Sequence, residues 1–331
     1  MKTSSNLRSH DKRLSNLVPA LAVLLLAAAP AASSRADDAT AAASASAPAT
    51  AEKPAPLPLH QIEGNGGIFS TLSAYIVNPP RDGEPVGRPS VGFAHVSLGY
   101  DKNLEALTIT VSPFKRLELG YGWDYLGLGD LPQALRSAGI VNYHQDQVQL
   151  HNVNARFQIL KEGEFDQKWL PAVTAGAHFK YNATYDDVNS QLKGTLEAIG
   201  VSQNNSVDFT LYASKLITQL PRPVLVELGG RATEGVWNGL LGFTDSYNFL
   251  FEGNVVVFVT DSIALAAEYK QQLTAYTTVP GLIGRAGDWW TIDAAYVVNK
   301  HLTLAVGYGH FGTVLNNEAN GVWGITTKWE F

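Results

Sequence analysis

Charged side chains recur at every second position in stretches whose other residues are apolar or aromatic. A period of two places such side chains on one face of a β-strand. This face carries seven carboxylates, four Lys or Arg side chains and one histidine. They are Glu118, Asp124, Asp208, Glu227, Glu252, Glu268, Asp293, Arg156, Lys180, Arg231, Lys270 and His178. Because unpaired charges are very costly in an apolar core, the face must meet water, opposite charges or both.

Two interpretations of this charged face remain open. In the first, it lines a polar and mildly acidic passage through a barrel, which would favour cations. In the second, opposite charges on neighbouring strands pair and fill a narrow barrel that conducts nothing. The second is slightly favoured, because small barrels are often filled by their own side chains.

No pattern in the sequence predicts a catalytic residue, a metal site or a cofactor. The chain has no cysteine, and the seven-residue spacing of His144 and His151 suits neither a metal-binding pair on adjacent helix turns nor alternate positions on one side of a strand. We expect these two histidines to form a solvated loop pair. No nucleophile elbow is present, and the glycine-rich residues 64–67 lack the Lys and Ser or Thr of a phosphate loop. The net charge of −6 argues against nucleic acid as a partner.

The face opposite to the charges is rich in Trp and Tyr. Its members are Tyr121, Trp123, Tyr125, Tyr247, Trp290, Tyr308, Trp323 and Trp329. A sugar-binding path is one use for such residues, but the outer face of a transmembrane barrel meets lipid. Trp and Tyr are usual at the two membrane interfaces, so we predict an aromatic girdle.

The positions of these residues require a series of antiparallel strands. The chain is 45% hydrophobic and 16% charged, a balance typical of barrels in which lipid-facing and lumen-facing residues alternate. Short turns are predicted at 112–116, 161–169, 219–223, 260–262 and 299–301, and long loops at 127–146, 183–206, 235–246, 273–288 and 313–320. Residues 91–331 therefore predict an all-β, up-and-down transmembrane barrel of about 12 strands (12–14).

The strand assignment also predicts the effect of two substitutions on neighbouring residues. Leu119 is assigned to the lipid side and Gly120 to the lumen side. Leu119→Arg should therefore destabilise the barrel, whereas Gly120→Ser should be mild.

The N-terminal residues resemble an export signal followed by a linker. Four basic residues precede an apolar run at 17–32, and Ser34-Arg35-Ala36 resembles a small-x-small cleavage site. We expect a cleaved signal peptide at 1–36 and a disordered linker rich in Ala, Ser and Pro at 37–59. Residues 60–90 remain open between an extra strand and an inward-folded plug, although an even strand count favours a plug.

The last strand, at 322–331, ends with alternating apolar and aromatic residues. Trp329 and Phe331 share one face and resemble the signal read by the bacterial barrel-assembly machinery. Together with the signal peptide, this predicts the outer membrane of a Gram-negative bacterium. The expected partners are outer-membrane lipid, lipopolysaccharide and the barrel-assembly machinery.

Five stretches carry a resemblance to a known family. They are QIEGNGG (61–67), FKRLEL (114–119), DQKWLP (166–171), NGLLGF (238–243) and GDWW (287–290). In this order they resemble DUF3034, a proteobacterial outer-membrane family of unknown function. The resemblance implies the barrel fold and the location, but it implies no activity.

The leading functional hypothesis is a channel or small-solute transporter, because passive uptake requires a polar lumen and long outer loops are compatible with it. The alternative is a non-conducting barrel with a structural, adhesive or assembly role played by its outer loops. An enzyme is not expected, and the sequence does not identify a solute.

Overall fold

The computed structural model describes residues 59–331. The strands are β1 (Leu59–Gln61), β2 (Asn65–Gly67), β3 (Ser90–Gly99), β4 (Lys102–Phe114), β5 (Leu117–Gly127), β6 (Gln147–Leu160), β7 (Ala172–Asn182), β8 (Asn205–Ile217), β9 (Val224–Val236), β10 (Gly242–Phe258), β11 (Ile263–Lys270), β12 (Trp289–Val297), β13 (Leu302–His310), β14 (Thr313–Val314), β15 (Asn317–Glu318) and β16 (Val322–Glu330). The helices are α2 (Leu131–Ser137), α3 (Tyr185–Gln191) and α4 (Thr195–Ala198), with short 3₁₀ turns η1 (Glu164–Asp166) and η2 (Trp237–Gly239). The predicted signal peptide and nearly all of the predicted linker lie outside the described residues. Leu59, predicted as the last linker residue, belongs to β1.

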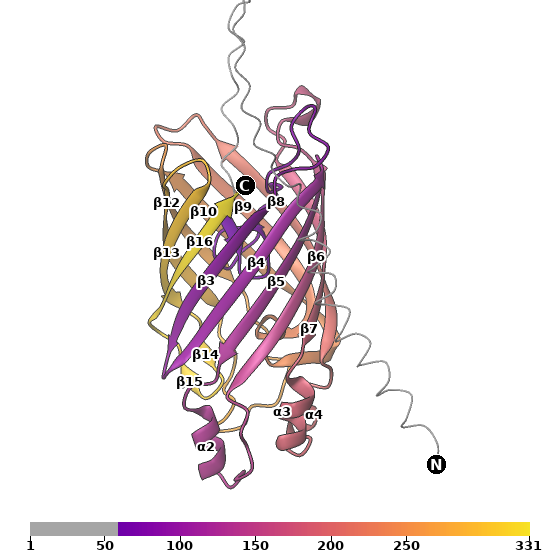
Figure 1. The fold of residues 1–331 in the computed structure, drawn as a ribbon, viewed down its shortest axis with the longest axis vertical. Helices are drawn as coiled ribbons and strands as arrows, with labels where there is room; N and C mark the ends of the chain where they lie inside the picture. Colours follow the sequence, from indigo (N-terminus) through magenta and orange to yellow (C-terminus); the bar gives the residue numbers. More distant parts are fainter. Residues whose placement is uncertain (1–58) are drawn as a thin grey trace, which may run out of the picture.

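Twelve antiparallel strands close into one barrel (Figure 1). They follow chain order from β3 to β13, and β16 then pairs with β3 to complete the wall. At this seam, Trp323 lies opposite Ser97 and Glu330 lies opposite Ser90. Because each strand has two neighbours, no strand edge is left unpaired. A sheet in lipid requires this pairing. The predicted antiparallel barrel of about 12 strands is confirmed.

The alternation of residue types separates a lipid side from a lumen side. Along β5, Glu118 and Asp124 are buried, whereas Trp123 and Tyr125 are exposed. Phe209 on β8 is 53% exposed. Large apolar side chains exposed in this number form the outward band that a transmembrane barrel presents to hydrocarbon. The chain is therefore a barrel of the bacterial outer membrane.

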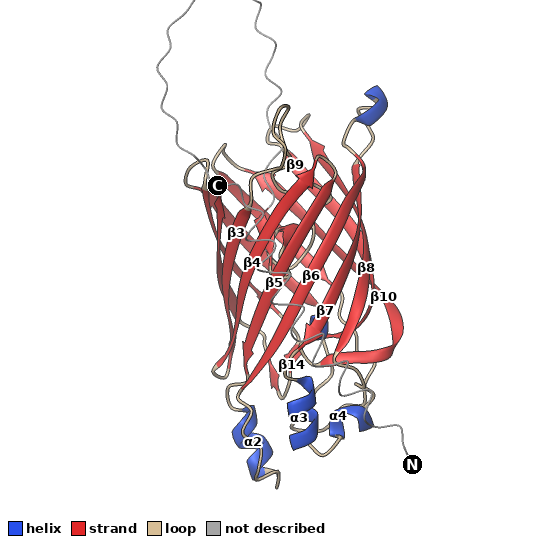
Figure 2. Ribbon diagram, turned by 45° about the vertical axis from the view of Figure 1, so that its right-hand side comes forward, coloured by secondary structure: helices blue, strands red, loops and turns tan. Residues whose placement is uncertain are grey.

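The two ends of the barrel differ in their connections (Figure 2). The C-terminus lies at one end with the turns that join β4 to β5, β10 to β11 and β12 to β13, and α2, α3 and α4 lie in long loops of the other end. Since such barrels keep short turns in the periplasm, we call these the periplasmic end and the outer end. Within residues 59–331, no helix is long and apolar enough to cross a membrane.

One connection that the sequence predicts as long is short. The prediction of a loop at 235–246 is wrong, because β9 continues to Val236 and β10 begins at Gly242. Asn238, Gly239 and Gly242 have φ values of 61°, 99° and 113°, which lets the chain reverse within a few residues. The polar residues 244–246 resemble a loop in sequence but belong to β10. They lie where the register between β10 and β9 shifts, between Phe243 and Asn248.

The N-terminal segment lies inside the barrel and is not part of its wall (Figure 1). β1 and β2 pair with each other and with no strand of the wall, with Leu59 opposite Gly67. Of the two arrangements expected for residues 60–90, the structure has the inward-folded one. We call residues 59–77 the plug; residues 78–89 lead back to β3.

The plug contacts β5 backbone to backbone, and glycines make this contact possible. Gly64 has a φ of 86°, and a Cβ atom there would lie 2.3 Å from the Tyr121 carbonyl oxygen. A Cβ atom on Gly120 would lie 2.0 Å from the Gly64 carbonyl oxygen. The expectation that Gly120→Ser is mild therefore does not fit the structure, because any side chain at Gly120 collides with the plug.

Because outward-facing residues meet lipid, the depth of such a residue in the membrane should determine how much a charge there destabilises the barrel. Leu211 lies at the middle of β8, and Ile217 lies on the same outward face at its periplasmic end. Leu211→Arg should lower the free energy of unfolding by roughly 2–4 kcal/mol, and Ile217→Arg by roughly 0–1 kcal/mol. Urea titration in lipid vesicles, followed by heat-modifiable gel mobility, measures both. Equal losses would contradict the assigned depth of β8.

Candidate functional site: the plugged lumen

The plug carries one carboxylate into the lumen, where three cations of the wall meet it. Arg231 Nη1 on β9 lies 2.9 Å from Glu63 Oε2. Lys180 Nζ on β7 and Lys270 Nζ on β11 lie 3.2 Å and 3.3 Å from Glu63 Oε1. All four side chains are buried. Without Glu63, this part of the wall would have an excess of positive charge.

Two wall carboxylates complete the central cluster. Asp208 Oδ2 lies 2.8 Å from Arg231 Nη1 and 3.0 Å from Lys180 Nζ. Glu252 Oε1 accepts a 2.7 Å hydrogen bond from Arg231 Nε and lies 3.7 Å from Lys270 Nζ. With Glu63, three carboxylates face three cations, so the formal charge of the cluster is balanced. This pairing is what an interior shielded from water requires.

A second ion pair holds the plug nearer the periplasmic end. Arg156 Nη1 lies 3.2 Å from Glu118 Oε1 and donates a 2.7 Å hydrogen bond to the Gly66 carbonyl oxygen. Glu118 accepts hydrogen bonds from the backbone N–H groups of Gly66 and Val77, at 3.2 and 2.8 Å. Both members of the pair therefore bind backbone groups of the plug.

Glu268 binds a turn of the plug through its backbone. It accepts hydrogen bonds from the N–H groups of Phe69, Ser70 and Thr71, the closest at 2.8 Å. Successive backbone N–H groups that converge in this way form an anion-binding nest. The wall carboxylate thus takes the place that a bound anion would have in such a nest.

Glu227 has a similar role with side-chain donors. It accepts hydrogen bonds from Ser73 Oγ at 2.5 Å, Ser214 Oγ at 2.7 Å and Asn254 Nδ2 at 2.9 Å. Ser73 belongs to the plug, and the other two donors belong to the wall. Glu227 therefore links the plug to two wall strands, Glu268 binds the plug backbone, and Glu252 takes part in the ion cluster.

Besides Glu227 and Glu268, three predicted lumen residues lie outside the ion pairs. Asp124 accepts a 2.9 Å hydrogen bond from Asn152, and Asp293 accepts one of 2.7 Å from Thr291. Each of these carboxylates keeps one buried oxygen without a hydrogen bond among residues 59–331. His178 lies 2.8 Å from Thr210 Oγ1 and, through its other nitrogen, 2.8 Å from Asn154 Oδ1.

All twelve charged residues proposed from the sequence are buried and belong to the barrel wall. Sequence reasoning missed Glu63, because it lies in a glycine-rich segment without strand alternation. It also missed His60 of the plug, which contacts Thr108 Oγ1 at 2.8 Å and Ser90 Oγ at 2.6 Å. A lone carboxylate between the apolar residues Ile62 and Ile68 was the available signal.

The aromatic residues proposed as a girdle lie on the outward face. Trp290 and Trp323 lie near the outer ends of β12 and β16, and Tyr308 is opposite Trp323. Trp329 lies at the periplasmic end, with its ring stacked 5.4 Å from that of His301. Aromatic residues are thus present toward both membrane interfaces. The assembly role of Trp329 and Phe331 stays a prediction.

The expectation that both His144 and His151 lie in a loop is wrong for His151. His151 lies within β6, which begins at Gln147, and its Nδ1 is 2.8 Å from the Tyr121 hydroxyl. His144 remains in the loop, where its Nδ1 contacts the Asn142 carbonyl oxygen at 2.9 Å. In the part of the chain that the structure describes, no group of three or more His, Cys, Asp or Glu side chains is placed to hold a metal ion.

Fold and site together define an outer-membrane β-barrel whose lumen holds an N-terminal plug. Residues 59–326 match the family described as "Protein of unknown function (DUF3034)". The match extends from the plug into the last strand, and the chain belongs to this family. The resemblance noted in the sequence is confirmed. A comparison with curated proteins finds no match.

Several solved barrels have a related architecture. The KdgM porin is 11% identical with a TM-score of 0.45, covering 73% of this chain and 99% of that chain. The outer membrane protein Omp33 of Acinetobacter baumannii is 9% identical with a TM-score of 0.42, covering 75% and 99%. Outer membrane phospholipase A from Escherichia coli is 11% identical with a TM-score of 0.35, covering 74% and 97%. At these values we draw no conclusion about activity from them.

The central cluster predicts a large effect for one neutral substitution in the plug. Glu63→Gln leaves three buried cations facing only two carboxylates, which should weaken docking of the plug by about 3–5 kcal/mol. Protease protection of residues 59–77, measured in vesicles at increasing urea, reports this loss.

Two further variants test whether charge balance is the cause. Adding Lys180→Met to Glu63→Gln removes the excess cation and should restore part of the protection. Asp82→Asn is the control, because Asp82 is solvated and contacts Lys115 at the surface. Equal effects of Glu63→Gln and Asp82→Asn would contradict the role given to Glu63.

Proposed function

We propose that this protein is an outer-membrane channel or transporter for small solutes, closed by its plug in the state described here. The observation that supports the proposal is that several charged side chains of the wall bind the plug. Glu118, Arg156 and Glu268 bind the backbone of the plug and do not fill the lumen by themselves. Water can replace such polar contacts when a plug moves, whereas a dry apolar interface would resist hydration.

The wall would be mildly acidic once the plug has moved. Among the charged side chains that are buried on the barrel wall, seven are carboxylates and six are Lys or Arg, because Lys102 and Lys328 join the four predicted from the sequence. An exposed excess of carboxylates creates a negative field in a narrow polar passage and concentrates cations there. Displacement of the plug should therefore produce conductance with a preference for cations.

One observation favours a second candidate function. The central cluster is balanced in charge when the plug is present, as in a barrel that stays filled. A non-conducting barrel would then act through its outer loops, in a structural, adhesive or assembly role. Conductance of a variant with a displaced plug separates the two functions.

Conductance steps in planar bilayers test the proposal with two serine substitutions on the same strand. Gly120→Ser should displace the plug, because its Cβ would lie 2.0 Å from the Gly64 carbonyl oxygen. Gly127→Ser is the matched control, because the nearest atom to its Cβ is 3.7 Å away. We expect Gly120→Ser to give larger and more frequent steps than the unsubstituted protein, with a cation-selective reversal potential in a KCl gradient.

The control should conduct as the unsubstituted protein does. Heat-modifiable gel mobility verifies that each variant has folded. If the folded Gly120→Ser barrel is silent although proteolysis shows that the plug has been released, the transport proposal fails and the non-conducting barrel is supported.

A further inference from the structure

A row of polar side chains crosses five neighbouring strands of the wall, from β8 to β12. On the lumen face, Ser214 and Asn254 flank Glu227. Asn254 and Thr291 in turn flank Glu268, and Asp293 follows Thr291 on the same face of β12. All of these side chains are buried. We call Ser214, Glu227, Asn254, Glu268, Thr291 and Asp293 the acidic row.

The acidic row has three carboxylates and no cation of its own. Among residues 59–331, the buried ion pairs of the lumen involve other carboxylates. Two oxygen atoms of the row, Asp293 Oδ1 and Asn254 Oδ1, are buried without a hydrogen bond in the same part of the chain. Both side chains are only 4% exposed. Because buried polar atoms normally have a partner, these oxygens indicate a missing donor or cation.

The plug supplies the donors that the acidic row has in this structure. The backbone N–H groups of residues 69–71 and the Thr71 hydroxyl bind Glu268, and the Ser73 hydroxyl binds Glu227. The Phe69 ring lies against Gly324 of β16, where a Cβ atom would be 2.9 Å from it. Withdrawal of the plug would vacate the space of residues 69–73 and leave the row without these donors.

The charges that remain after withdrawal define a suitable solute. Glu63 leaves with the plug, so Lys180, Arg231 and Lys270 keep two carboxylates of the central cluster, Asp208 and Glu252. With the acidic row, five carboxylates then face three cations, which is a formal excess of two negative charges. A small organic dication with primary ammonium groups would replace both the charge and the N–H donors of the plug.

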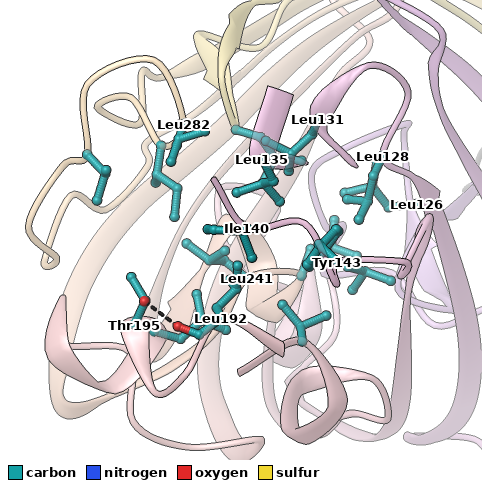
Figure 3. Close-up of a pocket in the computed structure, with 17 residues that line it drawn as sticks. Leu126, Leu128, Leu131, Leu135, Ile140, Tyr143, Leu192, Thr195, Leu241 and Leu282 are labelled. Atoms are coloured by element: carbon teal, nitrogen blue, oxygen red, sulfur yellow. Dashed lines mark hydrogen bonds between the residues drawn. The ribbon is translucent and has the colours of Figure 1, made fainter. Parts of the chain in front are cut away.

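The outer loops offer no comparable site to a charged solute. Their apolar side chains, among them Leu131, Leu192 and Leu241, meet above the lumen (Figure 3). None of the residues that line the small space between these loops is charged. Recognition of a cationic solute therefore belongs to the lumen wall, and withdrawal of the plug opens this wall toward the periplasm.

We propose that the acidic row is a binding site for small solutes that carry primary ammonium groups, and that the plug occupies this site in the closed state. The inference deepens the proposed function by naming a solute class, and it rests on that function for the step of transport. Binding itself can be measured in a barrel that never conducts. Because plug and solute use the same carboxylates, binding of the solute should favour release of the plug.

Competition with the plug can be measured on the full chain in phosphatidylcholine nanodiscs at constant ionic strength. Diaminobutane should increase protease cleavage of residues 59–77 in a saturable way, because it takes the place of the plug. Its hexamethylated derivative has the same charge and chain but no N–H group. We expect it to need a roughly tenfold higher concentration, since it cannot restore the lost hydrogen bonds. Equal effects of the two compounds would overturn the assignment to primary ammonium groups.

Direct binding can be measured by isothermal titration in Gly120→Ser, with displacement of the plug verified by proteolysis. In this background, Asp293→Asn removes one carboxylate of the row and should weaken diaminobutane binding roughly tenfold. Asp124→Asn is the matched control, because Asp124 is a buried carboxylate of β5 that also has one oxygen without a hydrogen bond among residues 59–331. It should leave binding unchanged. Equal losses in the two variants would contradict the acidic row as the site.

The outcomes separate the site from the transport function. Saturable binding of diaminobutane by a barrel that is silent in planar bilayers would support the site while transport fails. Cation-selective conductance of Gly120→Ser without binding of diaminobutane would uphold transport and overturn the site. Displacement of bound diaminobutane by an equal concentration of magnesium ions would also overturn it, because a site that uses N–H donors should not prefer a metal ion.

Discussion

The structure depends on one electrostatic constraint, which is that charges on the inner wall cannot turn to the lipid side. Each must find an opposite charge, a hydrogen-bond partner or water within the lumen. The wall satisfies part of this requirement between its own strands, as Asp208 does with Lys180. The plug satisfies a further part, because its Glu63 balances the central cations. Wall and plug are therefore one electrostatic unit, although only the wall carries the barrel fold.

The sequence was most informative where each strand has one face in lipid. Period-two alternation separates Trp123 and Tyr125 from Asp124 because two different environments select them, so strand facing and the lumen residues could be predicted. The plug has no such separation, because both of its faces meet the wall. Its contact with Gly120 depends on the positive φ of Gly64 and on the distance between two chain segments, which composition does not encode. The same limit applies to the apolar cluster of the outer loops, since its residues belong to loops that are distant in sequence.

The two ends of the molecule have different physical characters. Toward the periplasm, the plug and wall are joined by charge-assisted hydrogen bonds between Arg156, Glu118 and backbone groups. At the outer end, apolar residues from five loops pack together above the lumen. A solute crossing this barrel would therefore meet an apolar environment first and a charged one second.

The path of the plug has a mechanical consequence. At its start, His60 contacts Ser90, the first residue of β3, and near its end the Val77 N–H group binds Glu118 near the periplasmic end of β5. The segment thus enters and leaves through the same opening, as a re-entrant hairpin. Within residues 59–331, no segment has to be threaded through the barrel for the plug to withdraw. A pull from the periplasm could extract it while every hydrogen bond between wall strands stays intact, and release would let it return by the same path.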